Sequence, residues 1–124
     1  MSQDYMPRED KVRIIQEYVP GKQITIAHVI ANPDNSLYAK IGLDDNSSII
    51  KSAIGIITMT PSESAIIASD IALKTSGVDL GYIDRVTGTL IISGTVSEVE
   101  EALKAIVEFS QEKLGFTICP ITKT

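Results

Sequence analysis

The sequence contains few of the residues that active sites commonly use. It has one histidine, one cysteine and no tryptophan, and aromatic residues make up 5% of the chain. One histidine cannot build a multi-histidine metal site, and one cysteine cannot form a disulfide within the chain. The scarcity of aromatics leaves few platforms on which bases or sugars could stack. These absences fit a reducing, cytoplasmic setting, and we expect no metal and no cofactor.

Clusters of positive charge and long apolar runs are also missing. The net charge is −5 with a pI near 4.7, so we expect no nucleic-acid partner and no basic membrane-binding helix. No apolar run reaches the roughly 18 residues that a membrane-spanning helix needs. The N-terminal stretch MSQDYMPRED is too polar for a signal peptide. Gly55, Gly81 and Gly94 match no phosphate-binding loop and are predicted to mark close backbone approaches in strands.

The N-terminal part of the 124-residue chain reads as a polar leader followed by two strands. We expect residues 1–10 to be a flexible leader, Arg13–Tyr18 a strand and Pro20-Gly21 a turn. The segment Lys22–Ala31 alternates with period two. One face is predicted to carry Ile24, Ile26, His28 and Ile30, and the other Thr25, Ala27, Val29 and Ala31. A short helix at Ser36–Ile41 and a polar loop at Asp44–Ser48 follow.

The pattern is clearer from Ala53 onward, where a strand at Ala53–Met59 precedes a helix. Thr60 suits the N-cap of that helix, Pro61 its first position, and Glu63 can bond back to the cap. The helix is predicted to end near Ser76, before Gly77. Its apolar face is expected to contain Ile67, Ala68, Ile71 and Ala72.

A second copy of this pattern follows. Strands are predicted at Val78–Ile83 and Thr89–Ser93, with a turn at Asp84–Gly88 between them. Thr95 and Glu98 repeat the capping pattern of the next helix, which ends at Leu114-Gly115. The inward face of that helix is expected to contain Val99, Ala102, Leu103 and Ile106. The tail, Phe116–Thr122, alternates weakly and is predicted to pair as an edge strand.

The order from Ala53 is strand, helix, strand, strand, helix, which lacks one strand of a ferredoxin-like α+β sheet. Lys22–Ala31 can supply it from in front of the unit instead of behind it. Such a circular permutation is tolerated where the original termini lie close together at the surface. The sequence therefore predicts a permuted ferredoxin-like domain.

These segments resemble the bacterial microcompartment (BMC) shell-protein domain. The resemblance is carried by PSESAIIASDIALK at Pro61–Lys74, GY at Gly81-Tyr82, GTV at Gly94–Val96, and HVIANP at His28–Pro33, which is similar to the family's closing strand moved to the front. Three further motifs resemble the permuted shell proteins of the propanediol-utilisation U type and the ethanolamine-utilisation S type. They are RIIQEYVPGKQ at Arg13–Gln23, DRVTG at Asp84–Gly88 and ITKT at Ile121–Thr124.

The resemblance implies a structural role and no enzyme activity. It implies a permuted BMC domain at residues 22–124, in a flat homohexamer that tiles a shell with other shell proteins around enzymes in the cytoplasm. Residues 11–21 are implied to form a strand and turn, and six copies of the strand an axial β-barrel. The implied barrel residues are Arg13, Ile14, Ile15, Gln16, Glu17, Tyr18 and Val19.

The resemblance also implies two further sites. The turn formed by Asp84, Arg85, Val86, Thr87 and Gly88 is implied to lie near the sixfold axis, where Arg85 would form a positively charged ring. The alternative from the residues alone is a solvated turn with a local Asp84–Arg85 salt bridge. Asp70 and Lys74 are implied to lie at the hexamer edge, against the alternative that Lys74 is an ordinary exposed helix lysine.

For His28 and Cys119, a catalytic role competes with a structural one. Histidine is a common general base, but no acid or nucleophile accompanies His28, so a strand histidine bonded at a sheet edge or interface is favoured. Cys119 has no catalytic signature around it and is expected to be packed or interfacial. A ligand-sensing regulatory domain, binding a metabolite at a subunit interface, is the alternative function, since this fold hosts many activities.

Overall fold

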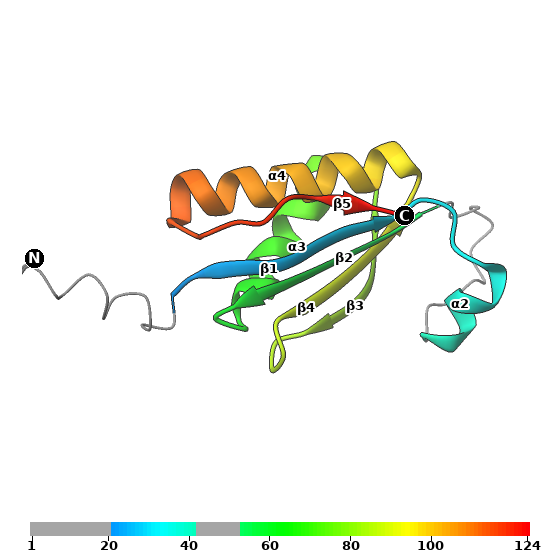
Figure 1. Cartoon of the computed structure of the whole chain (residues 1–124), viewed down its shortest axis with the longest axis horizontal. Coiled ribbons are helices and arrows are strands. Elements are labelled where there is room, and N and C mark those ends of the chain that lie inside the picture. The colour runs from blue at the N-terminus through cyan, green and yellow to red at the C-terminus, as the bar shows by residue number, and fades with distance from the viewer. Residues whose placement is uncertain (1–20, 42–52) are drawn as a thin grey trace, which may run out of the picture.

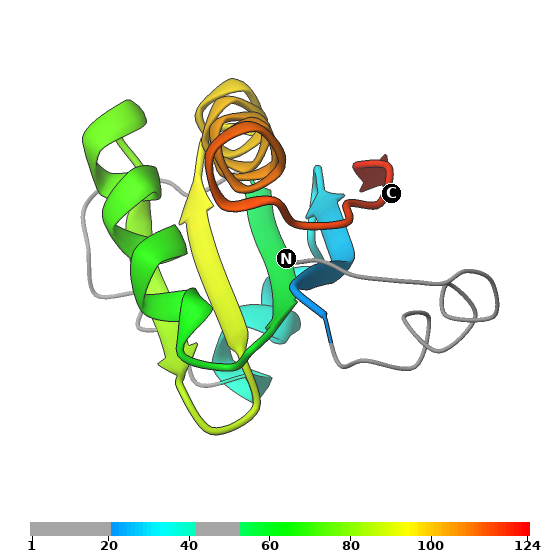
Figure 2. The same ribbon diagram turned by 90° about the vertical axis from the view of Figure 1, so that its left-hand side faces the viewer.

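The computed structural model describes residues 21–41 and 53–124. Five strands form one sheet in the order β3-β4-β2-β1-β5, and α3 and α4 lie side by side on one face of it (Figures 1 and 2). The elements, in chain order, are β1 (Gln23–Ile30), α2 (Asn35–Lys40), β2 (Ala53–Thr60), α3 (Ser64–Thr75), β3 (Asp79–Asp84), β4 (Thr89–Gly94), α4 (Val96–Leu114) and β5 (Thr122–Lys123).

The sheet confirms the ferredoxin-like prediction. The segment from β2 to α4 forms the strand–helix–strand–strand–helix unit, with β4 inserted between β2 and β3. Strand β1 pairs antiparallel with the free side of β2, which is the place of the missing fourth strand. The strand that precedes the unit in sequence thus completes its sheet, as expected of a circular permutation.

The alternation predicted for β1 is wrong at its first residues. A β-bulge between Ile24 and Ile26 shifts the register against β2. Ile24 is therefore buried together with Ala27 and Val29, whereas Ile26 is 49% exposed. A bulge adds one residue to one strand and so reverses which face the residues before it occupy.

The two predicted capping patterns have different outcomes. Thr95 caps α4 as predicted: its hydroxyl accepts from the Glu98 amide, and the Glu98 carboxylate accepts from the Thr95 amide. Thr60 is not an N-cap, because it is the last residue of β2 and pairs with Gln23. Helix α3 begins four residues later at Ser64, and its N-cap Glu63 makes no side-chain cap bond.

The inward face of α4 is as predicted, whereas that of α3 differs. Val99, Ala102, Leu103 and Ile106 are fully buried. In α3 the buried residues are small, namely Ser64, Ala65, Ala68, Ser69 and Ala72, while Ile67 is 44% exposed. Small side chains let a helix lie close to the sheet. Ile71 still packs against the core in part, whereas Ile66, Ile67 and Leu73 remain exposed. The prediction of Ile67 as a core residue was wrong.

Gly55 in β2 lies where other elements approach the strand backbone closely, as predicted. A Cβ added to Gly55 would lie 2.7 Å from Val99 of α4 and 2.9 Å from Ile92 of β4. The helix–sheet packing therefore depends on the absence of a side chain there.

The tail pairs as an edge strand only at its end and at one isolated bridge. Strand β5 runs parallel to β1, with His28 opposite Thr122, and Thr117 forms a bridge with Gln23. Several predictions lie outside the described residues: the leader 1–10, the strand at Arg13–Tyr18 with its barrel, Pro20 of the turn, and the loop Asp44–Ser48.

Candidate functional site

The turn between β3 and β4 is organised by one carboxylate. Asp84 Oδ1 accepts the amide of Val86 at 2.8 Å, and its Oδ2 accepts the hydroxyl of Thr87 at 2.9 Å and that of Tyr82 at 3.2 Å. The Val86 amide, and then the Thr87 hydroxyl, hold the pKa of Asp84 below its ordinary value of 3.8. The negative charge of Asp84 in turn raises the pKa of Tyr82.

Gly88 closes the same turn in a conformation that suits glycine alone. Its φ is +80°, its amide donates to Asp84 O at 2.8 Å, and its carbonyl accepts the amide of Met59 at 2.9 Å. A Cβ there would lie 2.1 Å from Met59 O. The turn is thus fastened to the end of β2 by a contact that leaves no room for a side chain.

The tip of the turn carries Arg85 and Val86. Within the described residues, no ion pair joins Arg85 to Asp84, so the local salt bridge of the alternative interpretation does not form within the single chain. Val86 is 81% exposed. A hollow of about 380 Å³ adjoins the turn and is lined by Ile66, Ile83, Asp84, Arg85 and Val86. The hairpin therefore presents a cation and an aliphatic side chain beside a hollow with both aliphatic and charged lining residues.

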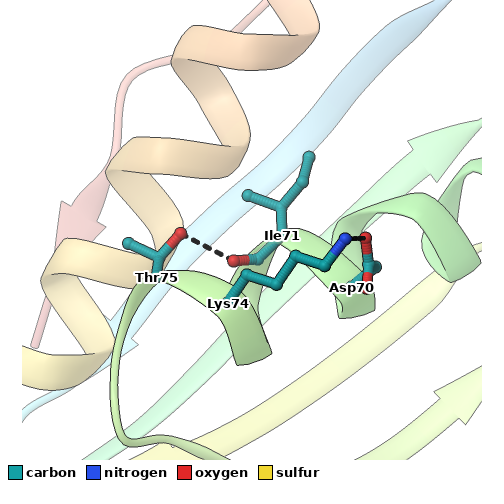
Figure 3. A network of polar contacts seen from close by, with 4 residues as sticks. All are labelled: Asp70, Ile71, Lys74 and Thr75. Atoms are coloured by element: carbon teal, nitrogen blue, oxygen red, sulfur yellow. Dashed lines mark hydrogen bonds and ion pairs between the residues drawn. The ribbon is translucent and has the colours of Figure 1, made fainter.

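Asp70 and Lys74 form an ion pair on the outer face of α3 (Figure 3). Lys74 Nζ lies 2.9 Å from Asp70 Oδ2, and the two side chains are 76% and 59% exposed. In the same turn, the hydroxyl of Thr75 donates to Ile71 O at 2.6 Å (Figure 3). Lys74 lies eight residues beyond Ile66, roughly 12 Å along the helix, so the structure separates this pair from the hairpin.

His28 fastens the C-terminal strand to β1. Its Nδ1 lies 2.6 Å from the hydroxyl of Thr122, and its Nε2 lies 2.9 Å from that of Thr124. Both ring nitrogens are thus engaged by hydroxyls, which can each donate or accept. The structure confirms the strand histidine at a sheet edge. No local pattern pointed to the threonine partners, because they lie more than ninety residues away in the chain.

Cys119 is a free, partly buried thiol that packs against the core, as expected. Across residues 21–41 and 53–124, no group of three or more His, Cys, Asp or Glu side chains could hold a metal ion. None of the helices in those ranges is both long enough and apolar enough to cross a bilayer.

A second hollow, missed by the sequence reasoning, lies at the same end of the molecule. It measures about 260 Å³ and is bounded by the start of α3, the end of α4 and the start of β1. Its floor is apolar and includes Pro61, Ile67, Leu114 and Phe116, with Lys22 and Glu63 also lining it. The ammonium of Lys22 donates to Leu114 O at 3.0 Å. Elements distant in sequence form this hollow, so no local motif marks it.

Many of the large aliphatic and aromatic side chains that remain exposed gather on α3, β3 and the hairpin. They include Ile66, Ile67, Leu73, Leu80, Tyr82, Ile83 and Val86. Exposed apolar surface of this kind is typical of a contact with another protein. The fold and the surface together define a small ferredoxin-like α+β domain suited to self-association.

Comparison with known proteins identifies the family. The BMC domain matches residues 53–122, and the chain belongs to the BMC-domain shell proteins of the PduU and EutS type. It is 54% identical to the bacterial microcompartment shell protein PduU of Salmonella typhimurium over 112 residues, covering 90% of this chain and 93% of the relative. It is 50% identical to the shell protein EutS of Escherichia coli over 115 residues, covering 93% and 99%.

Solved structures agree with the family. The fold matches a structure described as a CutR flat hexamer with a TM-score of 0.77 at 40% identity, covering 98% of this chain and 100% of that one. A CutR structure described as a screw matches with a TM-score of 0.75 at 44% identity, covering 85% and 100%. The match to the BMC domain begins at β2 and leaves β1 in front of it, which fits the permuted order.

Proposed function

We propose that this chain is a structural subunit of a bacterial microcompartment shell in the cytoplasm. Flat cyclic hexamers of it tile the shell, together with other shell proteins, around metabolic enzymes. The observation that carries the proposal is the match to the CutR flat hexamer, which spans 98% of this chain. The exposed aliphatic side chains of α3, β3 and the hairpin support it, because self-association would remove them from water.

The proposed role requires contacts between copies and no catalysis. The relatives named above are shell proteins, and nothing in the described residues favours the ligand-sensing alternative over a shell subunit. We therefore retain only the structural role.

Within the hexamer, we place Asp84, Arg85, Val86, Thr87 and Gly88 near the sixfold axis and Asp70 with Lys74 at the outer edge. The separation of the hairpin from the last turn of α3 supports this, since one end of a subunit in a ring faces the axis and the other faces neighbouring hexamers. Arg85 has no ion pair among the described residues. Its six copies would then form a ring of arginines around the axis.

We also propose that residues Arg13–Val19 add a strand to an axial β-barrel. The start of β1 and the β3–β4 hairpin lie at the same end of the molecule (Figure 1), so a segment preceding β1 is within reach of the proposed axis. A lone short strand leaves its backbone groups unpaired, and closing six of them into a barrel removes those edges.

Light scattering combined with electron microscopy tests the hexamer and its tiling. We expect a hexamer mass at micromolar concentration, and flat sheets or tubes on grids. A monomer at all concentrations would overturn the proposal. A discrete dimer whose stability depends on a metabolite would support the sensor instead.

A variant that begins at Lys22 tests the barrel. The hexamer should persist, because its domain contacts remain, while density over the axis is lost and the axis becomes open. A hexamer structure with residues 13–19 at the rim would contradict the barrel. Loss of folding in the shortened variant would show that the segment belongs to the core.

A further inference from the structure

We infer that Val86 of one subunit docks into the 260 Å³ hollow of its neighbour in the ring, and that Arg85 pairs there with the neighbour's Glu63. The inference rests on the proposed function, since it assigns the contact between ring neighbours. The occupant of the hollow is thus a second copy of this chain. We call this hollow the receiving hollow; it is lined by Lys22, Pro61, Glu63, Ser64, Ile67, Leu114 and Phe116.

Val86 is suited to insertion. At 81% exposed it is the most exposed large hydrophobic residue in the described part of the chain, where the next is at 50%. The bonds from Asp84 and Gly88 fix the turn beneath it, so little conformational freedom is lost when it docks. A rigid aliphatic side chain on a turn tip gains most from a concave apolar partner.

The receiving hollow has the complementary properties. Its floor combines a proline, an isoleucine, a leucine and a phenylalanine, and Ile67 remains 44% exposed in the single chain. Two charged residues line the hollow. The Lys22 ammonium already donates to Leu114 O, and Glu63 supplies the carboxylate. No ion pair or hydrogen bond of the Glu63 side chain is found among the described residues.

The charges on the two surfaces match. Arg85, next to Val86, has no ion pair within residues 21–41 and 53–124, while Asp84 beside it is already occupied by the donors of its own turn. The tip therefore offers a cation, and the hollow offers a carboxylate. Complementary charges at the rim of an apolar contact fix register and favour the correct partner.

The placement of the two surfaces favours a ring over a two-fold dimer. Ile66 lines the hollow beside the hairpin, whereas its neighbour Ile67 lines the receiving hollow. The tip and the receiving hollow therefore lie on different sides of the start of α3. A contact between two different patches is head-to-tail, and such contacts close into rings when the rotation between subunits closes, as in the flat hexamer of the proposed function.

Charge reversal tests the pair. We would compare the wild-type full chain with Arg85→Glu, Glu63→Arg and the double variant, using light scattering over a dilution series. Each single reversal should raise the concentration at half-assembly by about tenfold or more, and the double variant should recover most of that loss. Glu101→Arg and Lys104→Glu on the exposed face of α4 are the matched controls, and we expect them to assemble like the wild type.

Val86→Asp tests the docking itself, and should leave monomers at concentrations where the wild type is a hexamer. Thermal unfolding of each variant checks that the subunit is still folded. If the wild type is a hexamer and the reversals, their combination and Val86→Asp assemble equally well, this contact is wrong while the proposed function stands. A wild-type chain that never forms a ring would overturn both. A double variant that is no better than the single ones would overturn the Arg85–Glu63 pairing.

Discussion

At the scale of single residues, the β3–β4 turn shows how few atoms hold an exposed turn in one conformation. The carboxylate of Asp84 binds donors from three neighbours, and Gly88 supplies the positive φ and the close contact with Met59 O. Neither residue reaches a partner subunit in our proposal. Both act by holding the tip that carries Arg85 and Val86 in one conformation.

Gly88→Ala should destabilise the subunit more than Gly115→Ala. Both glycines have positive φ, at +80° and +74°, and forcing alanine into that region costs about 1–2 kcal/mol. Only Gly88 faces a backbone oxygen, because nothing lies within 4 Å of a Cβ at Gly115. Urea unfolding would measure the difference. Equal losses would show that the contact with Met59 adds no cost of its own.

Asp84→Asn should remove part of the acid sensitivity of the fold. Because the turn's donors lower the pKa of Asp84 below 3.8 in the folded state, its charged form adds stability that is fully present above that ordinary value. The contribution is lost as pH falls through the folded pKa. Unfolding free energies measured between about pH 2 and pH 6 should therefore vary less in the variant. Glu101→Gln on α4 is the control, and an unchanged profile for Asp84→Asn would contradict this role.

At the scale of elements, the two helices start differently although their sequences look alike. Both follow a strand and a T-x-x-E pattern, but the ladder with β1 extends β2 through Thr60. The following residues then form a separate turn before Ser64. At Thr95 no ladder competes, and the capping box forms. Strand pairing thus decides which of the two threonines becomes a cap.

Thr95→Ala should cost about 1 kcal/mol of unfolding free energy, because it removes an N-cap hydrogen bond from α4. Thr60→Ala should cost clearly less, since Thr60 is exposed and caps nothing. The two substitutions delete the same atoms, so chemical denaturation of both compares their contexts directly. A larger loss for Thr60→Ala would mean that it supports the start of α3 after all.

The edge strand β5 is a second feature at the scale of elements. The core sheet would end at β1, and β5 covers part of that edge through His28, Thr122 and Thr124. Lys123 adds an ion pair with Glu100 of α4 at 2.8 Å. A covered edge is less available for unwanted strand pairing, which matters for a chain that must associate through chosen surfaces only.

At the scale of the whole molecule, the apolar residues that remain exposed outside the core are the surfaces through which we expect copies of the chain to associate. Helix α3 buries small residues inward and exposes Ile66, Ile67 and Leu73. Its two ends have different proposed partners: the ring neighbour at the start and the next hexamer at Lys74. The helix would thus connect two levels of assembly.

Lys74→Ala should leave the hexamer intact and weaken sheet formation. Among the described residues, the Lys74 ammonium is found only in an exposed ion pair with Asp70, worth about 0.3–0.5 kcal/mol at most, so folding should hardly change. Electron microscopy over a concentration series would measure the threshold for sheets. Lys104→Ala on α4 is the control, and sheets at the wild-type threshold would contradict the edge role.

Local rules in the sequence determined much of this protein. Apolar runs, turn residues and a capping pattern located β2, the hairpin and α4, because these features depend on neighbours within a few residues. The missing fourth strand of that unit then predicted the permuted sheet. The family resemblance came from motifs that remain contiguous in the chain.

Tertiary structure decided the rest. The bulge in β1, the late start of α3, the threonine partners of His28 and the receiving hollow all depend on segments that are far apart in sequence. The burial of small residues under α3 was also decided there, since the closeness of the helix to the sheet selects which face turns inward. The periodicity and composition of α3 do not determine which of its faces is buried, because the shape of the sheet surface against which the helix packs decides this.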